Sequence, residues 1–548
     1  MRVDSTFSRF IASTQSHLGF DPRDQQLAAA QKLLGRVIAE MATGEGKTLT
    51  LAAAASLLAR KHQSVYIATA NDYLAQRDAQ WMQPIYRDQG LSASFVTSQS
   101  TPSQRTDAYR SPIVYATIRE FGFDYLRAAL AKRNGDAGIG SIRLDALIVD
   151  EADSVLIDEA RTPLIITAPL AQKDPAMESC YRWAAEIAAS FVDGQDYVRV
   201  DPGEAVALTD RGNQRVLHLK MPSEMKTLSM TDILHSLEQA IWVSQTMQAE
   251  RDYVVRDNRV AIVNEFTGRA SDKRSFATGI QQAIEAQQGL PISPPSQPVA
   301  RITVQDFADK FKHVCGTTAT AKESRQEFKQ VYDVAVVDIP LHQPSQRRML
   351  QPQFFSDQES KWQAIADETK SMIAKGRAVL IGTRSIPQSL SLAKVLDAQS
   401  IPHVVLNALN HQHESEIVAK AGQVGQVTVA TNMAGRGTDI QLSQEVHTTG
   451  GLHVIVSEPH SESRIDRQLI GRCARQGNPG STRLYASSTD QIFSDQVAVS
   501  KVTEKRIAKA QTARTQQHRL QRSRLMSHET AMATALKKLG LDPHLDPC

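Results

Sequence analysis

Short apolar runs alternate with longer amphipathic stretches over residues 36–166. The runs are Val37–Met41, Val65–Ala68, Ile113–Tyr115 and Leu144–Val149. Runs of this length predict buried strands, and amphipathic stretches such as Leu74–Tyr86 predict helices. Because strands and helices take turns, the pattern predicts a parallel sheet covered by helices.

The same pattern returns in the second half of the chain and predicts a second α/β domain. Its apolar runs begin near Val379 and continue at His403–Leu406, Val427–Ala430, Leu452–Val456 and Leu484–Ala486. Between the two series, residues 167–255 are charged and irregular, and a buried-strand pattern resumes at Val260–Val263. This order predicts an insertion within the first domain. The segment Gly289–Pro298 is rich in Pro and Gly and predicts an ordered surface loop or hinge.

The length of the chain agrees with several domains. Its 548 residues correspond to three or four units of roughly 150 residues each. We assign the first α/β domain to residues 1–166 and 256–345, the insertion to 167–255, the second α/β domain to 346–490, and a helical tail to 491–548. With 41% hydrophobic and 22% charged residues, the composition excludes a disordered chain.

The apolar residues and the cysteines indicate the cellular compartment of the protein and whether it holds disulfides or zinc. The apolar run Leu49–Ala59 is shorter than the roughly 20 residues that span a bilayer, and the first ten residues lack the order of a signal peptide. We therefore expect a cytoplasmic protein without a transmembrane helix. The four cysteines are scattered, with no CxxC and no His at metal-ligand spacing, which predicts neither a disulfide framework nor a zinc site.

Basic residues are concentrated at the end of the chain. Residues 501–548 carry ten Lys and Arg against four Asp and Glu, although the net charge of the whole chain is only +3. Helix formers continue from Val502 to Leu539 without Pro or Gly, which predicts a long basic helix or a helix pair. Such a segment either packs on the rest of the protein with a solvated face, or meets acidic lipid or nucleic acid. The composition leaves both interpretations open.

Residues 41–48 (MATGEGKT) follow a predicted strand and precede a predicted helix, which is the context of a phosphate-binding loop. The first of these residues is Met where the general pattern has a glycine. Gly44 and Gly46 permit the unusual backbone angles of such a loop, and the helix N-terminus presents unpaired N–H groups. We expect Lys47 to contact the β and γ phosphates of ATP and Thr48 to bind Mg²⁺.

A second motif, residues 147–153 (LIVDEAD), is an apolar strand that ends in carboxylates. Asp150 follows Lys47 by 103 residues. We expect Asp150 to hold Mg²⁺ through water and Glu151 to orient and deprotonate the attacking water. An acidic turn at a strand end without a catalytic role is the alternative, and the company of a phosphate-binding loop argues against it.

Two arginines in the second series provide positive charge for hydrolysis. Arg472 and Arg475 are three residues apart and so share one face if helical. We expect them to be arginine fingers, although such a pair alone is more often a surface salt-bridge site. Because Arg472 follows Lys47 by 425 residues, ATP is expected between two domains, where it reports their closure.

The order of these motifs is typical of helicase-like superfamily 2 ATPases. Two companions fit that class: residues 431–439 follow a buried strand, and Gln26 lies 21 residues before the phosphate-loop lysine. Longer motifs then carry a closer resemblance. They are Val149–Ile166, Asn71–Asp78 with Trp81, Glu120–Arg127, Glu265–Arg269, Gln282–Ala286, Ala430–Ile440 and Ile465–Gly480.

Together these motifs extend from about Gln26 to Asp490 and resemble SecA, the bacterial preprotein translocase ATPase. The resemblance implies two RecA-like motor domains and an inserted preprotein cross-linking domain at residues 167–255. It also implies ATP-contacting roles for Gln26, Gly44, Glu45, Gly46, Lys47, Thr48, Asp439, Arg472 and Arg475. The implied partners are unfolded preprotein, a SecYEG-type translocon channel and an acidic phospholipid surface. A cytoplasmic location, peripheral on the inner membrane, and a monomer or homodimer follow from the same resemblance.

The sequence also departs from the family. The family continues into a long scaffold helix, a helical wing, a two-helix finger and a zinc-binding tail, so we expect a shortened helical region here. Asn264 and Asn478 stand where the family usually has acids, and Ser463 and Ile470 stand where arginines are common. Because Ser463 and Ile470 remove charge near the domain interface, we expect the closed state to be less stable or differently gated.

Three functions follow from these patterns. The first is an ATP-driven translocation motor in which the insertion grips an unfolded polypeptide. The second is a nucleic-acid helicase, which the +3 charge and 5% aromatic residues do not favour, because they give no strand-stacking groove. The third is an accessory or substrate-restricted paralogue in which ATP binding acts mainly as a conformational switch.

Overall fold

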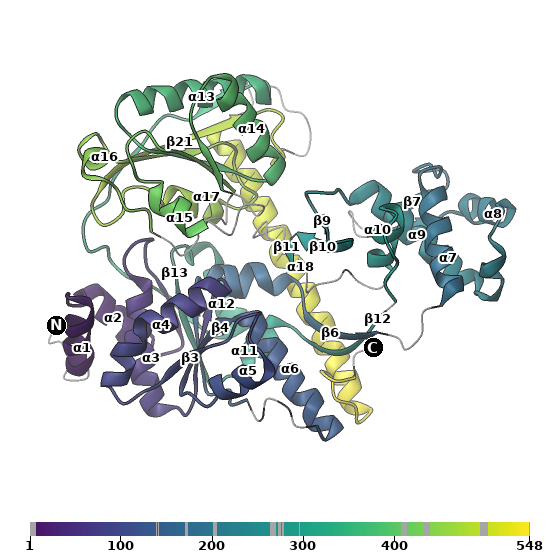
Figure 1. The fold of residues 1–548 in the computed structure, drawn as a ribbon, viewed down its shortest axis with the longest axis horizontal. Helices are drawn as coiled ribbons and strands as arrows, with labels where there is room; N and C mark the ends of the chain where they lie inside the picture. Colours follow the sequence, from purple (N-terminus) through teal and green to yellow (C-terminus); the bar gives the residue numbers. More distant parts are fainter. Residues whose placement is uncertain are drawn as a thin grey trace.

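The computed structural model describes residues 7–136, 138, 140, 142–169, 174–200, 205–263, 270–271, 276, 279–294, 296–406, 414–431, 439–493 and 502–546. Two parallel-sheet domains lie one above the other in Figure 1, with an inserted unit to one side and one long helix along both domains. The predicted α/β fold class with two motor domains is therefore confirmed.

The first domain is built on a seven-stranded sheet of order β14-β1-β13-β5-β2-β4-β3, in which all neighbours are parallel. Its strands are β1 (Val37–Glu40), β2 (Val65–Thr69), β3 (Ala93–Phe95), β4 (Ile113–Thr117), β5 (Ala146–Asp150), β13 (His313–Thr318) and β14 (Ala335–Asp338). Its helices are α1 (Ser8–Leu18), α2 (Asp24–Lys32), α3 (Lys47–Lys61), α4 (Asp72–Asp88), α5 (Pro102–Ala108), α6 (Ile118–Asn134), α11 (Val304–Asp309) and α12 (Arg325–Tyr332). Strands β2 and β5 are buried along their whole length, between hydrophobic cores on the two faces of the sheet. Burial on both faces explains why these strands read as continuous apolar runs.

The second domain repeats this architecture with the order β15-β21-β20-β17-β19-β18, and β16 also pairs with β21. Its strands are β15 (Gln346–Met349), β16 (Gln353–Phe355), β17 (Val379–Thr383), β18 (Val404–Leu406), β19 (Val427–Thr431), β20 (Leu452–Val456) and β21 (Pro479–Ser487). Its helices are α13 (Gln358–Ala374), α14 (Ile386–Ala398), α15 (Glu414–Lys420), α16 (Gln444–Thr448) and α17 (Ser463–Ile470). Each apolar run predicted in this half of the chain is a strand or part of one, except that β18 begins one residue after the start of the predicted run, at Val404.

The inserted unit leaves the first domain through β6 (Leu164–Pro169) and returns through β12 (Ser296–Ile302), which pair antiparallel. Its helices are α7 (Pro175–Ala188), α8 (Asp210–His218), α9 (Met230–Thr246) and α10 (Ile280–Gln287). Its strands are β7 (Tyr197–Val200), β8 (Ala205–Leu208), β9 (Tyr253–Arg256), β10 (Arg259–Val263) and β11 (Ala270–Ser271).

Two sequence expectations differ from this arrangement. The boundary at residue 255 stays a prediction, but β10 pairs with β9 and β11 rather than with the first sheet, and α10 packs on α7 and α9. We therefore propose that the inserted unit continues to about residue 290. The expected surface loop at Gly289–Pro298 is wrong in part, because Leu290 and Ile292 are buried and β12 begins at Ser296. Pro298 lies in β12 next to an irregularity in the strand register, which is where a strand tolerates proline.

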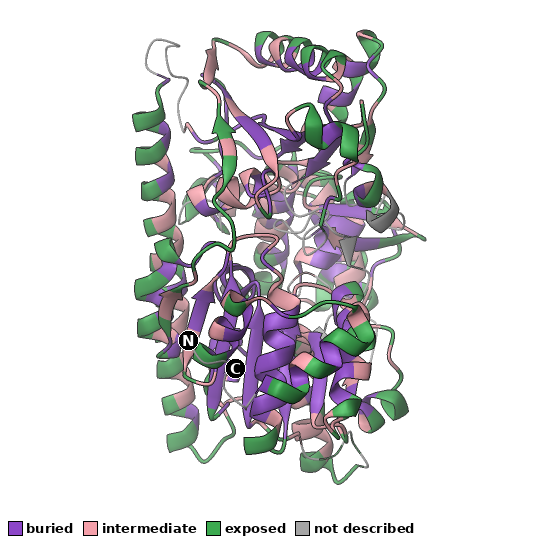
Figure 2. Cartoon of the chain, turned by 90° about the vertical axis from the view of Figure 1, so that its left-hand side faces the viewer, coloured by how far each residue is buried: buried purple, intermediate pink, exposed green. Residues whose placement is uncertain are grey.

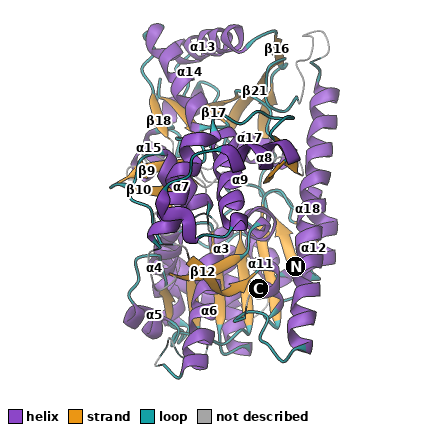
Figure 3. Cartoon of the chain, turned by 90° about the vertical axis from the view of Figure 1, so that its right-hand side faces the viewer, coloured by secondary structure: helices purple, strands orange, loops and turns teal. Residues whose placement is uncertain are grey.

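The basic tail is one continuous helix, α18 (Glu504–Lys538). It runs along both domains, with its outer face exposed (Figures 2 and 3). Ile507 and Gln511 are buried toward the second domain, whereas Arg522 is buried toward the first. The interpretation that the helix packs on the rest of the protein is thus confirmed, while a role for its exposed basic residues at a lipid surface stays a prediction. Among the described residues, no helix has the length and apolar character needed to cross a membrane.

Candidate nucleotide site between the two domains

The phosphate-binding loop connects β1 to α3 at the edge of the first sheet that faces the second domain. Gly44 and Gly46 have φ of 89° and 80°, in the left-handed region that favours glycine. A Cβ on Gly46 would lie 2.1 Å from Gln26 Nε2, so a larger residue there would collide with α2. Because α3 begins at Lys47, its first N–H groups point into the loop as an anion site requires.

The strand-end acids lie beside this loop. Lys47 Nζ donates to Glu151 Oε1 at 2.7 Å, and both side chains are about one-tenth exposed. Asp150 Oδ1 accepts from the backbone N–H of Glu151 at 3.0 Å and from Thr317 Oγ1 at 3.2 Å. Burial raises the pKa of Asp150 to about 6, and the neighbouring Glu151 charge adds to this rise, while Lys47 opposes it.

The arginine loop, residues 471–478, meets the phosphate loop from the second domain. Arg475 donates from Nε to Gly471 O at 3.0 Å and forms an ion pair with Asp439. A Cβ on Gly44 would lie 3.0 Å from Cδ of Arg475, and a Cβ on Gly471 would lie 2.8 Å from Thr43 Oγ1. The two loops are therefore in close contact, backbone against side chain, across the domain interface.

A cavity of about 930 Å³ lies between these loops. It brings together every residue expected to act on nucleotide or metal except Glu45; those lining it are Gln26, Gly44, Gly46, Lys47, Thr48, Asp150, Glu151, Asp439, Arg472 and Arg475. Phe20, Arg77 and Trp81 also line it. Residues 432–438, which form the expected loop before Asp439, lie outside the described part of the chain. The motif at residues 265–269 and Asn264 lie outside it as well.

Glu45 is not among the residues that line this cavity, and its contact with nucleotide stays a prediction. Its carboxylate is buried, accepts from the backbone N–H of His342 at 3.2 Å and lies 3.9 Å from Arg23 NH1. Its backbone carbonyl accepts from Gln26 Nε2 at 2.8 Å. The Glu45 side chain thus joins the phosphate loop to the segment that connects the two domains, and only its backbone faces Gln26.

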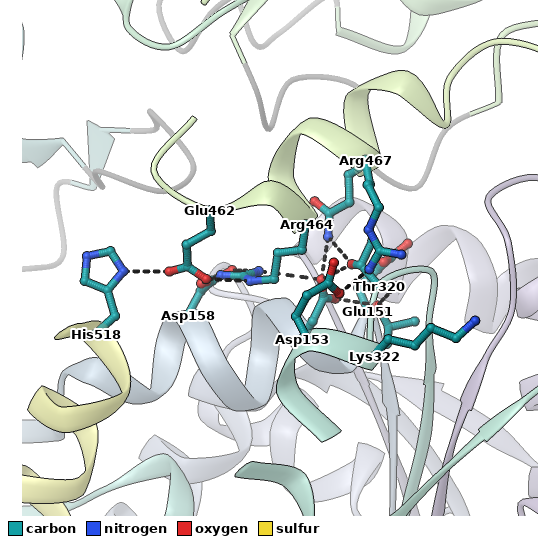
Figure 4. Close-up of polar contacts among 12 residues, drawn as sticks. Glu151, Asp153, Asp158, Thr320, Lys322, Glu462, Arg464, Arg467 and His518 are labelled. Atoms are coloured by element: carbon teal, nitrogen blue, oxygen red, sulfur yellow. Dashed lines mark hydrogen bonds and ion pairs between the residues drawn. The ribbon is translucent and has the colours of Figure 1, made fainter. Parts of the chain in front are cut away.

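Sequence reasoning missed a polar network that crosses the interface beside the cavity (Figure 4). Asp153 accepts from Thr318 Oγ1, Thr320 Oγ1 and Gln468 Nε2, each at 2.5 Å. Arg464, fully buried, donates from NH1 to Asp158 Oδ2 at 2.8 Å and from Nε to Glu462 Oε2 at 2.8 Å.

In this network the Glu462 carboxylate lies between Arg464 and His518. His518 Nδ1 on α18 lies 2.6 Å from Glu462 Oε1. Burial alone would raise the pKa of Glu462, but the hydrogen bond with His518 and the Arg464 charge hold that pKa well below its usual range. Arg464 also follows Ser463 directly, so the interface keeps a buried arginine beside the position that departs from the family. The only signal in the sequence was the charge-rich string from Glu462 to Arg467.

The residues in the cavity fit a nucleotide with Mg²⁺. Glycines, a lysine and a helix N-terminus provide for phosphate, while Thr48 and Asp150 provide the oxygen ligands that Mg²⁺ prefers. A phosphate loop and strand-end carboxylates on one parallel sheet, faced by arginines from a second, define a two-domain ATPase.

The chain belongs to the SecA family, because the SecA DEAD-like domain model matches residues 3–329 and the SecA P-loop domain model matches residues 344–449 and 442–511. Membership of this ATPase family implies the use of ATP and Mg²⁺.

Individual relatives agree with the family. Protein translocase subunit SecA 2 of Rhodopirellula baltica is 42% identical over 495 residues, covering 86% of this chain and 75% of that protein. Protein translocase subunit SecA of Halothermothrix orenii is 43% identical over 471 residues, covering 86% of this chain and 55% of that protein. The chain thus spans about half the length of the latter. Among solved structures, Dbp5 of S. cerevisiae bound to RNA and ADP BeF3 matches 88% of this chain and 87% of its own at 12% identity and a TM-score of 0.44, which carries no argument about function.

Proposed function

We propose that this chain is an ATP-driven motor of the Sec protein translocase, which couples hydrolysis to the transfer of unfolded preproteins through the translocon channel. The observation that carries the proposal is the single cavity in which the strand-end acids of one domain meet the arginine loop of the other. Because hydrolysis at such a site depends on how closely the domains approach, it can drive motion of one domain against the other.

The residues divide the chemistry as follows. Lys47 and the amide groups at the start of α3 bind the phosphates, and Thr48 and Asp150 would hold Mg²⁺, which would neutralise developing charge. To contact phosphate, Lys47 exchanges its ion pair with Glu151 for a phosphate oxygen. This exchange releases Glu151 Oε1 to take a proton from the attacking water.

Charge at the transferred phosphate is stabilised from the second domain. Arg472 lines the cavity and acts as the arginine finger, and Arg475 assists from its ion pair with Asp439. Gln26 supports the loop through Glu45 O and lines the cavity. An Arg472→Ala variant is expected to keep ATP binding and to lose turnover by roughly 10³-fold, the factor typical of arginine fingers.

We infer the polypeptide substrate and the translocon channel from membership of the SecA family. In the described part of the chain, the strands β6 and β12 attach the inserted unit to the first domain, so we propose that it moves relative to the motor and grips the unfolded preprotein. We further propose a cytoplasmic protein at the inner face of the membrane.

Transport itself tests this function. Purified chain, ATP and vesicles that contain the translocon are expected to make an unfolded preprotein resistant to added protease. The Glu151→Gln variant serves as the inactive control. No protection by the wild-type chain, with turnover of ATP intact, would favour the restricted or accessory role, and complementation of a full-length SecA for general export would exclude that role. Turnover stimulated by RNA or DNA would instead indicate a helicase.

A further inference from the structure

Gln476, directly after Arg475, makes a polar contact between the arginine loop and the phosphate loop. Its Nε2 donates to Gly44 O at 3.1 Å, and its Oε1 accepts from Arg23 NH2 at 3.1 Å. One amide side chain from the second domain therefore satisfies a phosphate-loop carbonyl and a guanidinium of the first domain at once.

The partners of Gln476 are themselves held in place. The backbone N–H of Arg23 donates to Gln26 Oε1 at 2.9 Å, and Arg23 NH1 lies 3.9 Å from the buried Glu45 carboxylate. The receptor for Gln476 is thus built from the start of α2 and from the phosphate loop itself. Any movement of that loop is passed to Gln476 through Gly44.

The backbone of the arginine loop supports a constrained role. Gln476 and Ala474 have φ of 52° and 55°, a region that residues with a Cβ rarely adopt. Such conformations persist where the surrounding structure fixes them, often at functional sites.

We propose that Gln476 is a positioning residue for ATP hydrolysis, which docks the arginine loop on the phosphate loop and so orients Arg472 and Arg475 toward the γ-phosphate. This inference rests on the proposed ATPase site. Because a misplaced catalytic group lowers the rate more than it lowers ground-state binding, loss of the contact acts on kcat rather than on ATP affinity.

The test compares Gln476→Ala and Gln476→Gly with the wild-type chain. Both are expected to lower kcat about 5- to 10-fold and to leave the Kd of a fluorescent ATP analogue within about twofold, as expected when an interaction acts in the transition state. Arg23→Ala is expected to lower kcat as well, and the double variant Arg23→Ala/Gln476→Ala to be no slower than the slower single variant. Gln423→Ala, an exposed glutamine of the second domain, is the matched control.

A kcat within about twofold of wild type in both Gln476 variants overturns the proposal. Loss in the alanine variant but not in the glycine variant also overturns it, because strain at the left-handed position would then be the cause. Hydrogen exchange of the amides of residues 43–48 gives a readout that needs no turnover, and it is expected to be faster in both variants. If amide exchange is faster in the variants than in the wild-type chain, but the wild-type chain does not hydrolyse ATP, the proposed function is contradicted while the docking contact is supported.

Discussion

Lys47 and Glu151 form an ion pair at 2.7 Å within the cavity, next to the Asp150 carboxyl. Glu151 also has φ of 52°, so the backbone presents its side chain from a conformation that residues with a Cβ rarely adopt. Glu151 therefore lies beside Lys47, the residue expected to contact phosphate, where a general base is needed.

Removing only the proton-accepting capacity of Glu151 tests its role. Glu151→Gln keeps the size of the side chain, so ATP binding is expected to remain while turnover falls by roughly 10²- to 10⁴-fold, the contribution of a general base. Single-turnover kinetics together with binding of a fluorescent analogue measure both quantities. Glu359→Gln, on the exposed start of α13, is the control. Unaltered turnover in Glu151→Gln would assign the base to another residue.

The raised pKa of Asp150 predicts a pH-dependent change in stability. Its pKa is about 6 in the folded chain, above the usual 3.8, so the native state binds a proton more tightly than the unfolded state. Stability from this group is present below about pH 4 and is lost as the pH rises through about 6. Asp150→Asn is therefore expected to raise the Tm of the nucleotide-free protein at pH 7.5, and to raise it less at pH 4.5.

Thermal unfolding at the two pH values measures this difference, and a gain in Tm that is equal at both would contradict burial as the cause. The same variant is expected to lose ATP turnover, as is common where a site carries a destabilised charge.

The sequence indicated some of these residues and not others, for a physical reason. The phosphate loop and the strand-end acids are contiguous strings, so their chemistry shows locally. Gln476 and Arg464 act through partners about 430 and 300 residues away, Gly44 and Asp158, and no local pattern reveals such pairs. Glu45 was expected at the nucleotide because the loop motif includes it, yet its side chain turns to His342.

At the scale of elements, α17 is the part of the second domain that carries charge into the interface. It holds the buried Arg464 and the half-exposed Arg467, which pairs with Glu323 of the first domain. Strands were predicted well because burial on both faces makes them continuously apolar, whereas the pairing of β6 with β12 depends on residues about 130 positions apart. Their pairing had no signal in the sequence.

The two arginines of α17 predict different costs on removal. Arg464→Met leaves Asp158 and Glu462 buried without their partner, which is expected to cost about 3–5 kcal/mol. Arg467→Met removes an ion pair that solvent reaches, with an expected cost of about 1 kcal/mol or less. Denaturant unfolding of both variants measures this. Equal costs for the two variants would contradict the claim that Arg464 compensates buried carboxylates.

Helix α18 makes a similar prediction on the first domain. The buried Arg522 donates two hydrogen bonds to Glu327, at 2.5 and 2.7 Å, and this contact fixes the middle of the helix. Arg522→Met is expected to speed hydrogen exchange along α18 about tenfold or more, since breaking a buried pair costs several kcal/mol. The exposed Arg524→Met is the control. No change in exchange would mean that apolar packing alone holds the helix.

At the scale of the whole molecule, α18 links both domains while the inserted unit is attached through two strands. His518 of α18 contacts Glu462 of the second domain, and Arg522 contacts Glu327 of the first, so relative motion of the domains must bend or release this helix. The inserted unit lies away from both domains in Figure 1, on the stem formed by β6 and β12. Closure of the two domains around the nucleotide can therefore move both α18 and the inserted unit.

The measurement that tests the account most directly is steady-state ATP turnover of the full chain, with and without an unfolded preprotein and translocon vesicles. The wild-type chain is expected to hydrolyse ATP and to be stimulated several-fold by preprotein and vesicles together, because coupling energies of about 1–3 kcal/mol correspond to such factors. Lys47→Ala, which is expected to lose nucleotide binding, sets the background. Turnover of the wild-type chain at that background, or turnover that preprotein and vesicles leave unchanged, would contradict a translocation motor.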